Sequence, residues 1–393
     1  MKQTLYLAWR YLAFHRVKTL ILLTSITLIL YLPVGLRVLV QQSSEQLTRR
    51  AQATPLVVGS KGSPLELVLN TLYFRSDYPE PMRYSELHEL QSSGLASTIP
   101  MYVRYHARGR PIVGTGFEYF DYRRLELQSG RFFTLLGECV LGARVAEALD
   151  ASVGDSVTSS PENLFDLAGE YPLNMGIVGI LAPSDSPDDD AIFVDVKTTW
   201  VIEGLGHGHQ DVTRRDAASA VASREKNRVV ANASIVHYNK ITPENVDQFH
   251  FHGEISEFPL TAVVVVPPDQ KSSALLQGRY QSDDTRVQIA RPSEIMGELL
   301  DTIVTVESFV LAGAVIVGLA TLASASLVFM LSLRLRRREM ETLFKIGGSR
   351  AGVGALMASE IGVVLLGGVV VAAGLTFLTS QFGAALVRSL VRM

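Results

Sequence analysis

Two histidine pairs are the residues of this sequence best suited to chemistry: His207 with His209, and His250 with His252. Alternate residues project to the same side of an extended segment, so each pair can present two imidazoles together. Four imidazole nitrogens are a suitable ligand set for a zinc ion. The competing interpretation is that these are solvated loop histidines, because the first pair lies in a glycine-rich run and the spacing matches no zinc finger. The sequence leaves both interpretations open.

Two further features are weaker candidates for chemistry. The run Asp188-Asp189-Asp190, preceded by serine and proline, could bind a hard cation through its carboxylates. An acidic turn of this kind is more often simply solvated. The single cysteine, Cys139, lies in an apolar run and is therefore predicted to be a small core residue.

The sequence templates of three enzyme classes are missing. There is no Gly-x-x-x-x-Gly-Lys-Ser/Thr, and the run Gly347-Gly348-Ser349 has neither the spacing nor the lysine of a phosphate-binding loop. The zinc-protease pattern His-Glu-x-x-His and the hydrolase pattern Gly-x-Ser-x-Gly do not occur either. We therefore expect a non-catalytic chain that neither hydrolyses ATP nor carries a cofactor.

A basic segment at residues 334–352 has the pattern of a short amphipathic helix that ends at a Gly-Gly pair. An exposed apolar face on such a helix can dock a cytosolic partner, although a connector lying among lipid headgroups has the same composition. The candidate docking residues are Arg337, Arg338, Met340, Glu341, Leu343, Phe344, Lys345, Gly347 and Gly348.

Long apolar segments flank this basic segment, and another lies near the N-terminus. We predict three transmembrane helices, at residues 19–40, 303–333 and 353–380, because each is long enough to cross about 30 Å of hydrocarbon. Small residues four apart in the last two favour close helix packing, although glycine and alanine are common in such helices. These packing candidates are Ala314, Gly318, Gly368 and Ala372.

Charge then predicts the topology. Residues 1–18 read as a basic amphipathic helix on the inner membrane surface, which places the loop 334–352 in the cytoplasm. Residues 41–302 must then form an extracytoplasmic domain, and residues 381–393 a C-terminal tail. Alternating strand and helix patterns in 41–302 predict an α+β fold, with residues 204–226 as a polar, mobile insertion. The net charge of -3 gives no reason to expect nucleic acid as a partner.

Several runs, in order along the chain, resemble one family. They are Gly130-Arg-Phe-Phe, Glu138-Cys-Val-Leu-Gly-Ala-Arg-Val-Ala-Glu-Ala-Leu, Val153-Gly-Asp-Ser-Val, Ile177-Val-Gly-Ile-Leu, and the basic segment that ends in Lys345-Ile-Gly-Gly-Ser. Together they are similar to the MacB/FtsX/LolC-type (type VII) ABC permeases, in which the last run reads Leu-Gly-Ala-Ser or a variant. Members of that family usually have four transmembrane helices, whereas three are predicted here.

The resemblance implies a MacB-like periplasmic domain and a dimer of permease subunits, homodimeric or heterodimeric, in a bacterial inner membrane. It also implies a separate cytosolic ABC ATPase, with ATP and Mg on that partner, and leaves room for a periplasmic partner. Such permeases transmit movement to lipid, lipoprotein or peptide cargo. The alternative from another class is a membrane-anchored extracytoplasmic binding or signalling module, metal-sensing and without transport.

Overall fold

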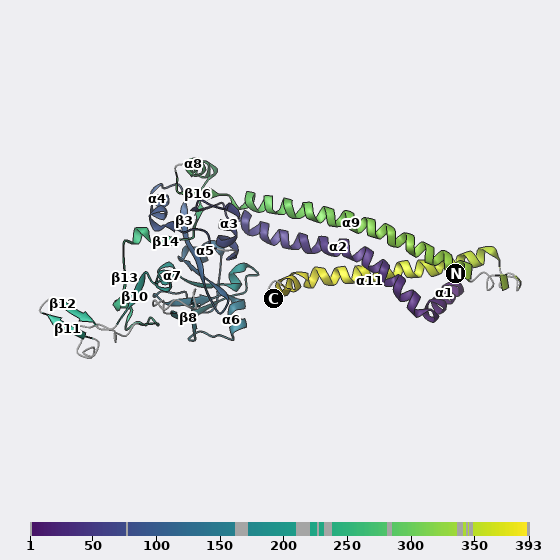
Figure 1. Ribbon diagram of the computed structural model, residues 1–393, viewed down its shortest axis with the longest axis horizontal. Helices are drawn as coiled ribbons and strands as arrows, with labels where there is room; N and C mark the ends of the chain where they lie inside the picture. Colours follow the sequence, from purple (N-terminus) through teal and green to yellow (C-terminus); the bar gives the residue numbers. More distant parts are fainter. Residues whose placement is uncertain are drawn as a thin grey trace. The chain divides into compact units, whose positions relative to one another are not determined.

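The computed structural model describes residues 2–75, 78–161, 172–209, 221–225, 228–231, 238–280, 285–335, 341–342, 345 and 349–390 (Figure 1). The chain divides into two compact units. One comprises Met1–Arg49 with Gly297–Met393, and the other is the continuous segment Arg50–Met296. The first unit is helical, whereas the second mixes strands and helices, so the predicted α+β class is confirmed.

The segment Arg50–Met296 is built on one large mixed sheet. Ten of the described strands form it, in the order β16-β1-β15-β3-β4-β9-β6-β8-β5 with β7 paired to β8. The pairs β4–β9 and β6–β8 are parallel, and the other pairs are antiparallel. The bounds are β1 Leu56–Ser60, β3 Ser97–Ala107, β4 Arg110–Thr115, β5 Leu127–Gly130, β6 Glu138–Leu141, β7 Ser156–Thr158, β8 Asn174–Leu181, β9 Ile192–Asp195, β15 Ala262–Val266 and β16 Val287–Ala290.

Burial along the strands follows their sequence patterns. Strand β15 is a continuous run of alanine and valines with four successive buried residues, as expected for a strand covered on both faces. Strand β8 alternates instead, with Met175, Ile177 and Leu181 buried on one face. Cys139 in β6 is fully buried, which confirms it as a core residue.

Short helices cover this sheet. Helix α3 packs on β1, β3 and β15, α7 on β3, β4 and β9, and α8 on β16. Ser63 caps α3 by accepting a hydrogen bond from the backbone N–H of Glu66, and Pro64 opens the helix as its sequence predicts. The bounds are α3 Pro64–Tyr73, α4 Tyr84–Ser92, α5 Glu118–Arg123, α6 Ala143–Leu149, α7 Val196–Ile202 and α8 Gln270–Tyr280, with the 3-10 turns η1 Pro187–Asp190, η3 Val246–Gln248 and η4 Ile255–Glu257.

The described residues of this unit also form three small two-stranded sheets. They pair β2 (Met82–Arg83) with β14 (Pro259–Leu260), β10 (Gly206–Gly208) with β13 (Phe249–Phe251), and β11 (Val221–Glu225) with β12 (Arg228–Ala231). Within residues 204–226, predicted to be a polar, mobile insertion, the described parts include the strands β10 and β11. A glycine-histidine alternation can pair as a strand when a partner strand supplies the packing. Residues 235–238, whose apolar and aromatic run also predicts a strand, lie largely outside the described residues.

The described part of the helical unit contains the helices α1 Lys2–Phe14, α2 Arg16–Gln52, α9 Pro292–Leu335 and α11 Arg350–Leu390. The last residues of α2 and the first of α9 belong to the other unit. In the described part of the chain, two helical stretches are long and apolar enough to cross a membrane, Arg16–Gln42 and Gly354–Gly383. Within the described residues of α9, the apolar stretch is Ser308–Ser324, which is shorter than either. Residues 381–390, expected as a tail, continue α11.

Candidate functional site

Most of the candidate docking segment lies outside the described residues. Glu341 and Lys345 are helical and exposed, while the other seven candidates, Arg337, Arg338, Met340, Leu343, Phe344, Gly347 and Gly348, are not described. Helix α9 ends at Leu335 and α11 begins at Arg350, so the segment connects two long helices.

The small residues of the helical unit lie where helices meet. A Cβ added to Gly368 of α11 would lie 2.6 Å from the Cγ2 of Ile26 in α2, and one added to Gly318 of α9 would lie 3.2 Å from the Cγ2 of Ile29. Ala372 is 5% exposed, and Ala314 is half-buried. Helix α2 therefore meets both α9 and α11 at glycines, as expected where helices approach closely.

The two histidine pairs come together on the two-stranded sheet of β10 and β13. His207 in β10 lies directly opposite His250 in β13 in the antiparallel register. His209 and His252 follow one residue after the two strands end. The ring centroids of His207 and His250 are 4.9 Å apart, and those of His207 and His252 are 4.7 Å apart. Pairing of β10 with β13 thus gathers four imidazoles that the sequence only places in two distant pairs.

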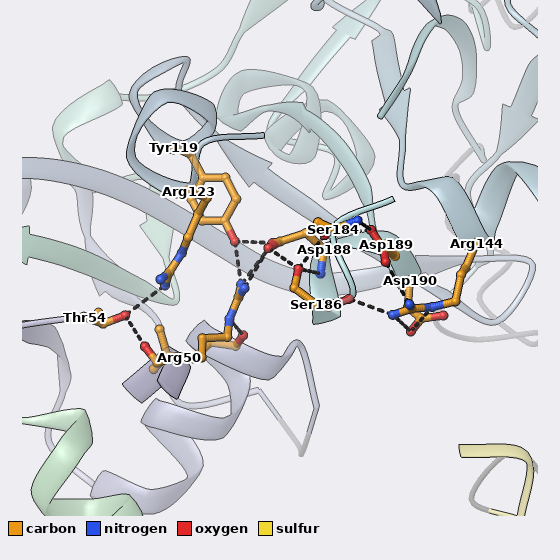
Figure 2. Close-up of polar contacts among 11 residues, drawn as sticks. Arg50, Thr54, Tyr119, Arg123, Arg144, Ser184, Ser186, Asp188, Asp189 and Asp190 are labelled. Carbon is orange, nitrogen blue, oxygen red and sulfur yellow. Dashed lines mark hydrogen bonds and ion pairs between the residues drawn. The ribbon is translucent and has the colours of Figure 1, made fainter. Parts of the chain in front are cut away.

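The acidic run Asp188-Asp189-Asp190 forms the turn η1, and its first two side chains are buried, not solvated (Figure 2). The guanidinium of Arg50 donates to both carboxylate oxygens of Asp188, over 2.6 Å and 3.0 Å. The Tyr119 hydroxyl donates to Asp188 Oδ1 over 2.6 Å, and Arg50 also donates to that hydroxyl. Both sequence interpretations of this run, a cation site or a solvated turn, were wrong, since an arginine supplies the positive charge.

The rest of the acidic turn is held in the same way. Arg144 of α6 donates to Asp189 Oδ2 and to Asp190 Oδ2, each over 2.8 Å, and Arg110 of β4 donates to Asp190 Oδ1 over 3.1 Å. The Ser184 hydroxyl donates to Asp189 over 2.7 Å. Each carboxylate of the turn therefore has an arginine partner, and η1 becomes the point where α5, α6 and β4 are tied together.

Arg50 also fixes the last turn of helix α2 within the sheet-containing unit. Its Nε donates to the backbone carbonyl of Leu72 in α3, in addition to the contacts with Asp188 and Tyr119. Its own carbonyl accepts from the Thr54 hydroxyl, which in turn accepts from Arg123. Three elements of this unit thus hold one arginine side chain.

Sequence reasoning missed this network. Arg50 and Asp188 lie 138 residues apart, and each belongs to an ordinary-looking charged run. The sequence held one signal, the three negative charges of the consecutive aspartates. Any of these carboxylates that is buried requires a cationic partner, because desolvation of its charge is costly. The sequence does not say which arginines supply it.

Asp188 and Glu138 have strongly depressed pKa values. Burial by itself raises the pKa of Asp188, but Arg50, Tyr119 and Ser186 outweigh it and lower the pKa to about 2. Burial likewise opposes the shift at Glu138, where hydrogen bonds from Arg131 and from the backbone N–H groups of Thr134 and Leu135 lower the pKa to about 2. Both groups stay ionised in the folded chain at pH values where the unfolded chain already takes up protons.

We therefore expect acid to destabilise this unit. A depressed pKa contributes stability that is present above the unfolded pKa, about 4, and is lost as the pH falls toward 2. The unfolding temperature should be level between about pH 7 and 5 and fall below about pH 4. Fluorescence of Trp200 in a Trp9→Phe background would measure it. Glu138→Gln should flatten the fall, whereas Glu257→Gln, in an exposed pair with Arg83, should not. An unfolding temperature near pH 2 equal to that at pH 7 would contradict the depressed pKa values of Asp188 and Glu138.

Comparison with known protein families identifies the family of this chain. The family model of the MacB-like periplasmic core domain matches residues 21–226, just over half of the chain. The chain belongs to this family. The resemblance seen in the sequence is thus confirmed, and the chain is an ABC transporter permease of the MacB/FtsX type, a membrane protein with a large extracytoplasmic domain.

Several solved structures are similar to part of this chain. The extracellular domain of the noncanonic ABC-type transporter YknZ from Gram-positive bacteria is 15% identical with TM-score 0.32, covering 60% of this chain and 98% of that one. The periplasmic region of MacB from Actinobacillus actinomycetemcomitans is 11% identical with TM-score 0.34, covering 64% and 97%. A domain of a putative permease from Porphyromonas gingivalis is 13% identical with TM-score 0.26, covering 60% and 86%. No curated protein matches the sequence. Family membership rests on the family model alone.

Proposed function

We propose that this chain is the membrane-spanning subunit of a type VII ABC transporter, driven by a separate cytosolic ATPase. The observation that carries the proposal is the match to the MacB-like periplasmic core domain over residues 21–226. ATP and Mg would be bound by the partner ATPase, and the chain itself would be non-catalytic. Two copies of the permease, or this chain with a related one, would assemble in a bacterial inner membrane.

The finer topology is part of the proposal. Residues 303–333 of α9 would form a third membrane span between the candidates at Arg16–Gln42 and Gly354–Gly383. The basic loop 334–352 would then face the cytoplasm, because positively charged loops stay on that side. Residues 41–302 would face outward and act on lipid, lipoprotein or peptide cargo.

Two features support a mechanical role. Glycine contacts at Gly318 and Gly368 join the helices of the helical unit closely, so these helices are suited to move together. The buried contacts of Arg50 hold the last turn of α2 within the extracytoplasmic unit. ATPase closure at the loop 334–352 would move the long helices, and a helix end held this firmly would transfer that movement to the domain.

The docking residues can be tested by co-purification. An ATPase partner should stay with the wild-type chain and be lost on Phe344→Asp, because a charge in an apolar docking face cannot be desolvated cheaply. The matched control is Phe117→Asp, the same change at a 47% exposed phenylalanine of the extracytoplasmic unit, which should leave the ATPase bound. Retention by Phe344→Asp would refute the docking assignment.

The histidine cluster favours a second candidate function. A membrane-anchored module that senses a metal would need a ligand-binding face but no ATPase, and the gathered imidazoles of β10 and β13 provide one. The same co-purification separates the two functions. A wild-type chain that captures no ATPase would support the sensing module over the permease.

A further inference from the structure

The histidine face of β10 and β13 is defined by His207, His209, His250 and His252. In an antiparallel pair, residues directly opposite share a face and the side chains alternate along each strand. His207 and His250 are opposite each other, and the other two lie two residues further along their own strands. All four imidazoles therefore share one face, and neighbouring ring centroids lie between 4.7 Å and 5.8 Å apart.

The ligand atoms are close to metal-binding geometry. One ring nitrogen from each of His207, His209 and His250 lies within 4.8 Å of the others. Nitrogens around a tetrahedral zinc lie about 3.3 Å apart, given Zn–N bonds of about 2.0–2.1 Å. Zinc binding would therefore require side-chain rotations that bring these nitrogens closer together. The ring of His252 stacks on that of His207 with an interplanar angle of 26°, and its centroid lies 4.8 Å from that of His250.

The opposite face explains why the histidines point where they do. A Cβ on Gly206 would lie 2.6 Å from the Phe251 ring, and one on Gly208 would lie 2.5 Å from the Phe249 ring. The glycines thus leave room for two phenylalanines. Phe251 packs in turn against Trp200 and Phe258 of the domain core, with ring centroids 6.3 Å and 5.9 Å away. Because the aromatic face is anchored to the core, the imidazoles are held on the outer face.

One imidazole has its ring orientation supported by the backbone. The Nδ1 of His250 lies 3.3 Å from the carbonyl oxygen of Gln248. In the tautomer that carries its proton on Nδ1, this nitrogen donates to the carbonyl and the Nε2 lone pair is available to a metal. A second hydrogen-bonded ring nitrogen is the usual arrangement around metal-binding histidines.

We propose that the histidine face of β10 and β13 binds a zinc ion through His207, His209, His250 and His252. Four neutral nitrogen ligands without a thiolate suit a four-coordinate Zn²⁺ ion. The site is exchangeable, since His250 is exposed and Phe251 already fixes the strands to the core without a metal. This proposal concerns the extracytoplasmic unit alone and does not depend on a partner ATPase.

The test uses the full chain in detergent, without a polyhistidine tag. The chain is first stripped of metal with a chelator and then dialysed against zinc. We expect one zinc per chain in the wild type and none in His207→Ala/His250→Ala. The control His88→Ala/His106→Ala removes two other exposed histidines of the same unit and should keep the zinc. Zinc should also raise the unfolding temperature of the wild type and of the control but not of the cluster variant, because a ligand of the folded state stabilises it.

Cobalt provides a geometric readout. Co²⁺ in the same site should show the strong visible absorption of tetrahedral coordination, and His252→Ala should change that spectrum. Without metal, the cluster variant should unfold at the wild-type temperature, which separates lost ligands from a damaged fold. The proposal is overturned if the wild type holds no zinc after dialysis, or if the cluster variant holds as much as the wild type.

Discussion

Replacing Arg50 with methionine should destabilise the extracytoplasmic unit by about 3–5 kcal/mol, because it leaves the carboxylate of Asp188 buried without a cation. The Asp188 side chain is 2% exposed, and that of Arg50 is 8% exposed, so water cannot take the place of the guanidinium. For a unit of this size the unfolding temperature should fall on the order of 10 °C. Methionine keeps the apolar stem of the side chain, so the loss reflects mainly removal of the guanidinium with its charge and hydrogen bonds.

The single cysteine provides the measurement. Cys139 is fully buried in β6, and burial raises the pKa of its thiol, so a thiol-reactive dye should label it only as the unit unfolds. Arg49→Ala is the matched control: Arg49 is the neighbouring arginine and is exposed, and its removal should leave the labelling temperature nearly unchanged. Equal labelling temperatures for Arg50→Met and Arg49→Ala would contradict the buried pair.

A double-mutant cycle separates the pair from its surroundings. Asp188→Asn alone leaves the guanidinium of Arg50 buried beside a neutral group, and it too should be strongly destabilising. In the double variant Arg50→Met/Asp188→Asn neither charge remains. The combined loss should therefore be smaller than the sum of the two single losses. Strictly additive losses would show that the two side chains act independently.

Gly142→Ala should also destabilise this unit strongly, by about 2 kcal/mol or more, through steric overlap. An added Cβ would lie 2.3 Å from the backbone oxygen of Asp188 and 2.5 Å from that of Asp189. Both atoms belong to the main chain of η1, which cannot move without disturbing the arginine contacts of its three carboxylates. The backbone of Gly142 itself, with φ -64° and ψ 152°, suits any residue, so the effect is purely one of space.

Gly176→Ala is the control for this prediction. Gly176 lies in β8 of the same sheet, and a Cβ there would meet nothing within 4 Å. Its substitution should change the Cys139 labelling temperature little. If Gly142→Ala behaved like Gly176→Ala, the close approach of α6 to the acidic turn would be refuted.

The local patterns of the sequence were sufficient for several of the elements. Proline after serine placed the start of α3, the valine run placed β15, and two long apolar segments placed the candidate spans at Arg16–Gln42 and Gly354–Gly383. Each of these predictions depends only on residues that lie close together in the sequence. The helices α4, α5 and α7 were not predicted, because short helices depend more on tertiary packing than on their own propensity.

The histidine face shows where the sequence was ambiguous. The spacing of the histidines indicated two pairs but not whether they meet. Only the pairing of β10 with β13, and the Phe251 anchor on the core, decided that they share a face. The same holds for Asp188, whose burial depends on an arginine 138 residues away.

The sequence by itself determined two candidate spans, the basic character of residues 334–352 and the family, because hydropathy, charge and short motifs are properties of neighbouring residues. The tertiary structure alone decided which charges are buried together and which imidazoles meet. Those are contacts between segments distant along the chain, and the order of residues does not state which of many possible partners the fold will bring within hydrogen-bond distance.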